Sequence, residues 1–123
     1  MDTLNVKNDY KYYDGYEPEP ELVITLNNEK YHIWDGFFYQ IIKEPYAFQV
    51  DWKGFTRDFH LLTGIYDIDS EIHKIEPKEY LEDLLHYKDN NFSFPESREV
   101  FNLLVSLLTR AINENLDVFI EII

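Results

Sequence analysis

The sequence has 123 residues, of which 45% are hydrophobic and 17% aromatic, and its formal net charge is −13. This length suits one ordinary domain and is too short for two separate cores, while the high apolar content argues against disorder beyond the N-terminus. The acidic balance disfavours direct contact with nucleic acid or an anionic membrane and favours a basic partner. The alternative is that the negative charge only keeps the protein soluble.

Residues 1–20 contain several tyrosines among acidic residues, and Gly15, Pro18 and Pro20 interrupt any regular period. This composition predicts an extended acidic, Tyr-rich arm preceding a single domain of residues 21–123. Tyrosine is favoured at protein interfaces, so the arm offers a surface to a partner. The alternative is a loosely packed tail, as chain ends commonly are.

The segment Glu21–Leu26 is rich in β-branched residues and predicts a strand that ends in the turn at Asn27-Asn28-Glu29. From Tyr31 to Lys43 the apolar residues recur at helical spacing, which favours an amphipathic helix over a second strand of a hairpin. Residues 46–69 are irregular and collect aromatic and acidic side chains. They have room for one short helix, Thr56–Thr63, capped by Thr56 and ended by Gly64.

A weak strand is expected within Ile65–Ile75, and Pro77 opens a helix that extends to Tyr87. The main helix follows, with Ser93 and Glu96 at capping-box spacing, Pro95 in the first turn, and Asn113 and Asn115 at the end. The final strand, Val118–Ile123, is continuously apolar around Phe119, which predicts burial on both faces and therefore a parallel sheet. The predicted core of these two elements consists of Val100, Leu104, Leu107, Leu108, Ile112, Val118 and Ile120.

The order of strands and helices predicts an α/β fold, a layer of helices on a short, mostly parallel three-stranded sheet. Catalytic motifs are not visible in the sequence. There is no cysteine, no Gly-rich phosphate loop, no His pair at metal-ligand spacing and no nucleophile elbow. We therefore expect a protein that is not an enzyme and needs neither cofactor nor metal.

The N-terminus lacks the apolar region of a signal peptide, and no run approaches the roughly 18 apolar residues of a membrane span. Together with the absence of cysteine, this favours a cytoplasmic location without a membrane partner.

Several short strings resemble barstar-like ribonuclease inhibitors and related bacterial toxin-immunity proteins. They occur in the family's order, namely Val23–Glu29 as first strand and turn, Asp51-Trp52-Lys53-Gly54 as the loop before the second helix, Leu62-Thr63-Gly64 as that helix's end, and Val100–Glu114 with Asp117–Ile123 as closing helix and strand. The resemblance implies a barstar-like domain that covers a basic toxin's active site with an acidic, aromatic surface.

The chain departs from the family at the residues that plug the ribonuclease. Trp52 stands at the loop aromatic, but the stretch between Gly54 and Gly64 is shorter. One alignment places Asp58 and Leu62 at the two aspartate positions, and the other places Thr56 and His60 there. Arg110 falls where the family's closing-helix glutamate would be. The resemblance therefore implies a mode of action and not the same target.

We accordingly predict a proteinaceous inhibitor, most simply an immunity protein that neutralises a cognate, basic toxin, with a nuclease favoured because phosphate-binding clefts are basic. A small acidic adaptor or ligand-binding domain is the alternative. The predicted contact surface lies within residues 46–69. It is centred on Trp52, in a loop that Gly54 keeps out of regular secondary structure. It comprises Asp51, Trp52, Asp58, His60, Tyr66 and Asp67.

Overall fold

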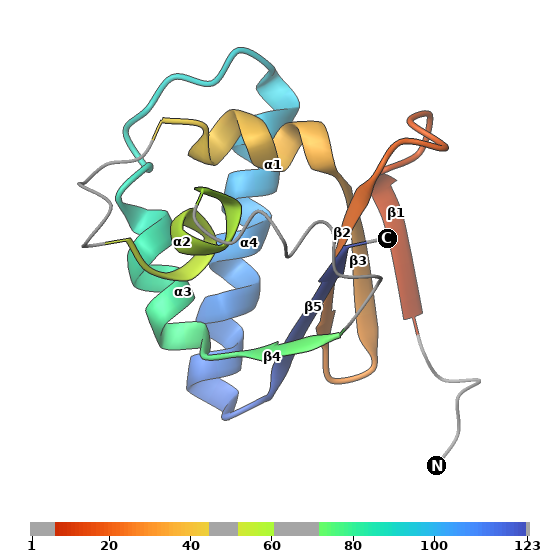
Figure 1. Ribbon diagram of the computed structural model, residues 1–123. Helices are drawn as coiled ribbons and strands as arrows, with labels where there is room; N and C mark the ends of the chain where they lie inside the picture. Colours follow the sequence, from red (N-terminus) through yellow and green to blue (C-terminus); the bar gives the residue numbers. More distant parts are fainter. Residues whose placement is uncertain (1–6, 45–51, 61–71, 123) are drawn as a thin grey trace.

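The structure is a computed structural model that describes residues 7–44, 52–60 and 72–122. These residues form nine elements along the chain (Figure 1), in the order β1 (Lys7–Tyr12), β2 (Glu21–Leu26), β3 (Glu29–Trp34), α1 (Asp35–Ile42), α2 (Gly54–His60), β4 (His73–Ile75), α3 (Pro77–Leu85), α4 (Pro95–Glu114) and β5 (Val118–Ile122).

The five strands form one sheet in the order β1-β3-β2-β5-β4, and the prediction of a mostly parallel three-stranded sheet is wrong. Strand β2 pairs antiparallel with both β3 and β5, and β4 pairs antiparallel with β5. Among the described strands, only β1 and β3 run parallel. Residues 7–12, part of the segment expected to be an arm, thus form an edge strand of the sheet.

The helix predicted for Tyr31–Lys43 is wrong over its first residues, where the alternative of a hairpin strand is correct. Leu26 pairs with Glu29 across a tight turn, and Asn27 has a positive φ of 57°, which Asn tolerates better than most residues. Strand β3 then continues to Trp34, and helix α1 begins only at Asp35. The strand wins because each of its residues pairs with a residue of β2.

The apolar run of the last strand does not mean burial on both faces. Val118 and Ile120 are buried, whereas Phe119 and Glu121 are only half-buried, so burial alternates as expected for a strand with one covered face. Figure 1 shows the helices gathered on one side of the sheet. The core fills the space between that side and the helices, and contains Leu22, Ile24, Leu26 and Ile33 from the sheet.

Helix α4 has the predicted apolar face and the predicted end. Asn115 adopts the left-handed conformation at φ 55° and its backbone N–H donates to the Ala111 carbonyl. The predicted capping box is wrong, since Phe94 is the N-cap residue and makes no side-chain cap. The predicted core residues are buried except Ile112, which is 39% exposed because Ala111 faces the core in the last turn instead.

The two shorter helices differ from prediction mainly at their starts. Helix α2 begins at Gly54, so Thr56 lies inside it and is not its cap, while the expected end at Gly64 lies outside the described residues. Helix α3 begins at Pro77 as predicted, after Glu76, whose side chain accepts a weak 3.4 Å hydrogen bond from the Lys78 backbone. It ends at Leu85, two residues earlier than expected.

A charged contact joins α4 to β3. Both terminal guanidinium nitrogens of Arg110 donate to the Glu29 carboxylate at 3.0 Å, and the Tyr31 hydroxyl donates to the same group. The hydrogen bonds from Arg110, then that from Tyr31, lower the pKa of Glu29 from 4.5 to about 2. Arg110, which the family alignment places at a binding position, therefore serves the fold.

We expect Glu29→Gln to lower the free energy of unfolding by about 1–2 kcal/mol at pH 7, after discounting for the partly exposed Arg110 side chain. Because the folded-state pKa of Glu29 is depressed, its contribution is present above about pH 5 and disappears as the pH falls toward 2. Urea unfolding at pH 7 and at pH 3 should show the difference between wild type and variant shrinking. Glu19→Gln, which alters an exposed carboxylate, is the control; an equal difference for Glu29→Gln at both pH values would contradict the assignment.

Candidate functional site

The predicted contact residues are only partly within the described chain. Asp51, Tyr66 and Asp67 lie outside the described residues. Asp58 and His60 lie in helix α2, near its C-terminal end, but their side chains are not described. Trp52 lies two residues before α2 and is half-buried. Trp52 is therefore the one predicted contact residue whose side chain is described. The contacts that hold the short loop between it and α2 can be traced in the structure.

That loop is held by a buried carboxylate on helix α3. The Asp83 side chain is fully buried, and its Oδ2 accepts a 3.0 Å hydrogen bond from the Thr56 backbone N–H in the first turn of α2. The Thr56 hydroxyl lies 2.5 Å from the Tyr87 hydroxyl, also buried. A side-chain oxygen that accepts from a backbone N–H of the first turn stabilises a helix N-terminus, and here it also fixes where α2 begins.

Gly54 is required by this close approach. It has a positive φ of 56°, and a Cβ placed on it would lie 2.8 Å from the Asp83 Cβ and 3.2 Å from the Tyr80 Cα. On the surface, Lys53 donates to Glu82 at 3.0 Å, which lowers the pKa of that carboxyl, and Arg57 lies 3.4 Å from Glu79. The residues that follow Trp52 are thus fixed to α3 by both buried and exposed contacts.

Sequence analysis did not identify Asp83 as part of the site. The signal was available in the spacing of the helix, because Tyr80, Asp83, Leu84 and Tyr87 recur every three or four residues and so share one face. Burying an acidic residue in the middle of such an apolar face is costly unless the carboxyl group has a hydrogen-bond partner, so the pattern indicates that a partner exists. In the structure this face is the one that packs against α2.

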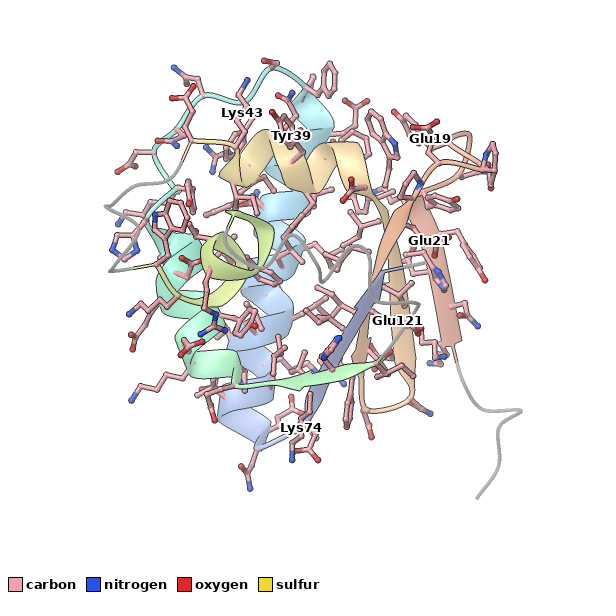
Figure 2. All side chains as sticks on the ribbon, in the orientation of Figure 1. Glu19, Glu21, Tyr39, Lys43, Lys74 and Glu121 are labelled. Carbon is pink, nitrogen blue, oxygen red and sulfur yellow. The ribbon has the colours of Figure 1, made fainter. Side chains whose placement is uncertain are left out.

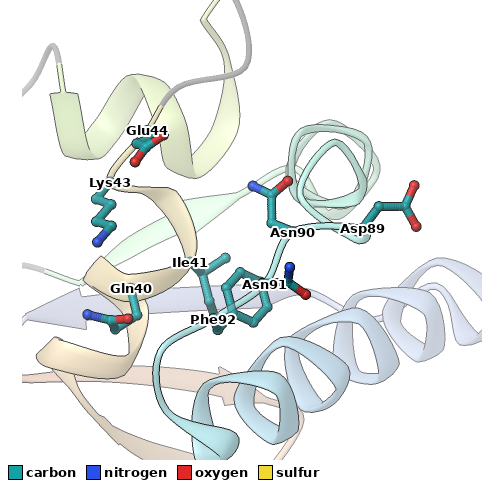
Figure 3. Close-up of a pocket in the computed structure, with 8 residues that line it drawn as sticks. All are labelled: Gln40, Ile41, Lys43, Glu44, Asp89, Asn90, Asn91 and Phe92. Carbon is teal, nitrogen blue, oxygen red and sulfur yellow. The ribbon is translucent and has the colours of Figure 1, made fainter.

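A hollow of about 380 Å³ lies near the C-terminal end of α1 (Figure 3). Its lining combines the apolar side chains of Ile41 and Phe92 with amide and charged side chains: Gln40, Lys43, Glu44, Asp89, Asn90 and Asn91. The lining mixes charges of both signs and contains no Ser, Thr, Cys or His. It can take a side chain of a partner, but nothing in it indicates catalysis.

Four aromatic rings from three separate segments form a second feature, which we call the aromatic cluster: Tyr16, Trp34, Phe37 and Phe94. Tyr16 stacks on Trp34 with ring centroids 4.2 Å apart and planes 9° from parallel. Phe37 meets both rings edge-on, and Phe94 lies 6.4 Å from Trp34. Sequence analysis placed Trp34 in a helix and missed this assembly.

A polar group fastens the edge strand β1. His32 Nδ1 bonds the Glu21 carboxylate, His32 Nε2 lies 2.9 Å from the Asn8 amide oxygen, and Tyr10 stacks on the imidazole at 4.1 Å. His32 and Glu21 are buried and both ring nitrogens are engaged, so the group suits a structural role better than proton transfer to a substrate.

Two further features are absent from the described residues. They contain no group of three or more His, Asp or Glu side chains placed to hold a metal ion. No helix among them is both long and apolar enough to span a membrane.

Comparison with known proteins finds no matching family model, no matching curated protein and no matching solved structure. The function must therefore be argued from the residues of this chain.

Proposed function

We propose that this chain is a proteinaceous inhibitor of the toxin-immunity type, which acts in the cytoplasm by covering the basic active site of a cognate toxin. A nuclease is the favoured toxin, because a phosphate-binding cleft is basic and complementary to a chain of net charge −13. The resemblance to barstar-like inhibitors supports this mode of action. It does not extend to the sheet, whose strands are arranged differently.

The observation that carries the proposal is the distribution of charge. Several basic side chains are engaged within the protein, as in the pairs Arg110–Glu29, Lys53–Glu82 and Lys74–Asp117. In contrast, the exposed carboxylates of Asp14, Glu17, Glu19 and Glu96 have no basic partner among the described residues. Negative charge thus remains available to a partner, where it favours fast and selective association.

Trp52 is the proposed centre of the contact, with Asp51, Asp58, His60, Tyr66 and Asp67 around it. Tryptophan is among the residues most enriched at binding hot spots. The anchoring of Gly54 and Thr56 to Asp83 supports this choice, because a loop held in place loses less conformational entropy on binding.

The proposal is tested by finding the partner and showing inhibition. We expect the tagged chain, used as bait in its native cells, to retain a basic protein whose enzymatic activity falls when the purified chain is added in equimolar amount. The association rate constant, measured by stopped flow, should fall by at least about tenfold between low and high salt. A retained protein whose activity is unaffected, or an association rate independent of salt, would contradict the proposal.

In that complex, Trp52→Ala should weaken affinity by about 2 kcal/mol or more and leave the melting temperature of the free protein nearly unchanged. Calorimetric titration and thermal unfolding supply the two measurements. Tyr10→Ala, which removes an aromatic side chain of 49% exposure from the edge strand β1, is the control. Unchanged affinity, or collapse of the free Trp52→Ala protein, would show that the tryptophan is not a contact residue.

A further inference from the structure

We propose that the aromatic cluster, with the carboxylates around it, is a second contact surface that binds an arginine side chain of a basic partner. This inference rests on the proposed function for the identity of the natural partner. Its chemistry, a guanidinium group on stacked aromatic rings, rests on four rings that the proposed function does not use, whereas the carboxylates around them are the ones that also support that function.

The cluster is assembled at one end of the molecule from segments far apart in the chain. Figure 1 shows that the loop between β1 and β2, the start of α1 and the start of α4 lie at this end. Tyr16 comes from the first of these segments, Trp34 from the residue before α1, and Phe94 from the N-cap of α4. Phe37 is buried at 2% exposure and supports the other three rings from below.

The indole of Trp34 is held in place by the chain itself. A Cβ on Gly36 would lie only 2.4–2.6 Å from three atoms of the six-membered ring of Trp34, so the ring lies directly against this glycine. Tyr16 covers an indole face, and Phe37 meets the ring edge-on at 5.1 Å. Gly36, which weakens α1 as a helix, thus allows a fixed aromatic surface.

The cluster nevertheless stays partly open to solvent. Tyr16 and Trp34 are half-buried, and Phe94 is 40% exposed, which is more than expected of rings that serve only the core. Exposed, preordered aromatic rings are the usual receptors for cationic side chains, and indole is the strongest of them.

The charge around the rings is negative. Asp14, Glu17 and Glu19 flank Tyr16 in the same exposed loop, Figure 2 shows Glu19 on this loop, and Glu96 follows Phe94 in the first turn of α4. Asp35, next to Trp34, has a carboxylate oxygen that is buried and has no hydrogen-bond partner among the described residues. The nearby cations are engaged elsewhere: Lys11 lies 3.9 Å from Glu99, one turn further along α4, and Arg98 donates to the Asn90 carbonyl and lies over the Phe92 and Phe101 rings.

This combination selects a cation with a flat, weakly hydrated face. Arginine stacks on aromatic rings and can donate to two carboxylate oxygens at once, whereas lysine is a compact, strongly hydrated charge. An acidic or neutral partner side chain would leave the negative charge of the carboxylates around the cluster without an opposite charge. A basic segment of the partner, with arginine over the Trp34–Phe94 side of the cluster, fits the surface best.

The test uses the two tryptophans of the chain, Trp34 and Trp52. In a Trp52→Phe protein, fluorescence excited at the long-wavelength edge of tryptophan absorption, where the ten tyrosines absorb little, reports on Trp34. We expect hexa-arginine peptide at low salt to change this emission saturably, and to bind at least about threefold more tightly than hexalysine. Hexaglutamate should have no effect.

Matched variants in the same background separate ring contact from general charge. Phe94→Ala should weaken hexa-arginine binding about threefold or more, whereas Tyr10→Ala, which removes a ring outside the cluster that is 49% exposed against 40% for Phe94, should not. If Phe94→Ala does not fold, Phe94→Leu, which removes the ring and keeps an apolar side chain, replaces it, with the same expected loss. Equal responses of the Phe94 and Tyr10 variants, or no change in Trp34 emission, would overturn the proposal and leave the rings as supports for the loop.

The outcome is separable from that of the proposed function. Peptide binding at Trp34 without an inhibited partner in cells would retain this surface and contradict the toxin inhibitor. The converse result is a partner whose activity the chain inhibits, while Phe94→Ala changes neither the affinity for that partner nor the binding of hexa-arginine. That result would support the toxin inhibitor and contradict this second surface.

Discussion

Leu104→Ala is expected to lower the free energy of unfolding by about 2–5 kcal/mol. Leu104 has no exposed surface and lies midway along α4, the helix that packs against both α1 and α3. Truncation removes most of the apolar side chain and leaves a cavity that a close-packed core cannot fully close. Urea unfolding, followed by far-ultraviolet circular dichroism, measures the change through the transition midpoint.

Ile112→Ala is the matched control on the same helix. Sequence periodicity places Ile112 in the core, but the side chain is 39% exposed, so the loss should stay below about 1 kcal/mol. Equal losses for the two variants would mean that Ile112 is buried in solution and that α4 is rotated relative to the structure. Unchanged stability of Leu104→Ala would mean that α4 is not the centre of the core.

Features that depend on neighbouring residues could be predicted from the sequence. The apolar spacing along α4, the stop at Asn115 and the β-branched residues of β2 all act within a few positions, and all three are found. The direction of the strands could not be predicted in this way. Pairing of β5 with both β2 and β4 depends on contacts between segments distant in sequence, and the apolar run at Val118–Ile120 does not encode its neighbours.

The error at β3 has a more specific cause. Ile33, Trp34, Phe37 and Phe38 satisfy helical spacing although the element changes between Trp34 and Asp35. Gly36 was the sign of this change, because a glycine in the first turn of a short helix needs a reason. The reason is the indole of Trp34, which lies against it. The same ring belongs to the aromatic cluster. Because Trp34 was assigned to a helix and not to the end of β3, the cluster could not be predicted from the sequence.

The predicted contact around Trp52 depends on a hydrogen bond whose partners no local pattern pairs. The spacing along α3 marks Asp83 as an acidic residue on an apolar face, but it does not say which group Asp83 bonds. Asp83 and Thr56 are 27 positions apart, and their hydrogen bond forms only because α2 packs against α3. Sequence reasoning therefore found Trp52 and the glycine that follows it, but not the support that the Asp83 side chain provides by fixing this segment to α3.

Gly54→Ala tests that support directly and is expected to cost about 2–4 kcal/mol. About 1 kcal/mol comes from forcing alanine into the left-handed conformation, and the remainder from a Cβ 2.8 Å from the Asp83 side chain and 3.2 Å from the α3 backbone. The backbone atom cannot turn aside as a flexible side chain would. Relief of the contact therefore requires α2 to move away from α3, which strains the Thr56–Asp83 hydrogen bond.

Gly15→Ala isolates the steric part of this cost. Gly15 also has a positive φ, 93°, but no atom lies within 4 Å of the position its Cβ would take, so only the conformational cost of about 1 kcal/mol applies. The difference between the two variants in urea unfolding then measures the contact with α3. If the Trp52 loop is the contact surface, Gly54→Ala should also weaken partner binding by displacing the indole, while Gly15→Ala should affect it less. Equal stabilities of the two variants would show that α2 moves freely on α3, and a loop that moves freely cannot present Trp52 in the fixed position on which the proposed contact depends.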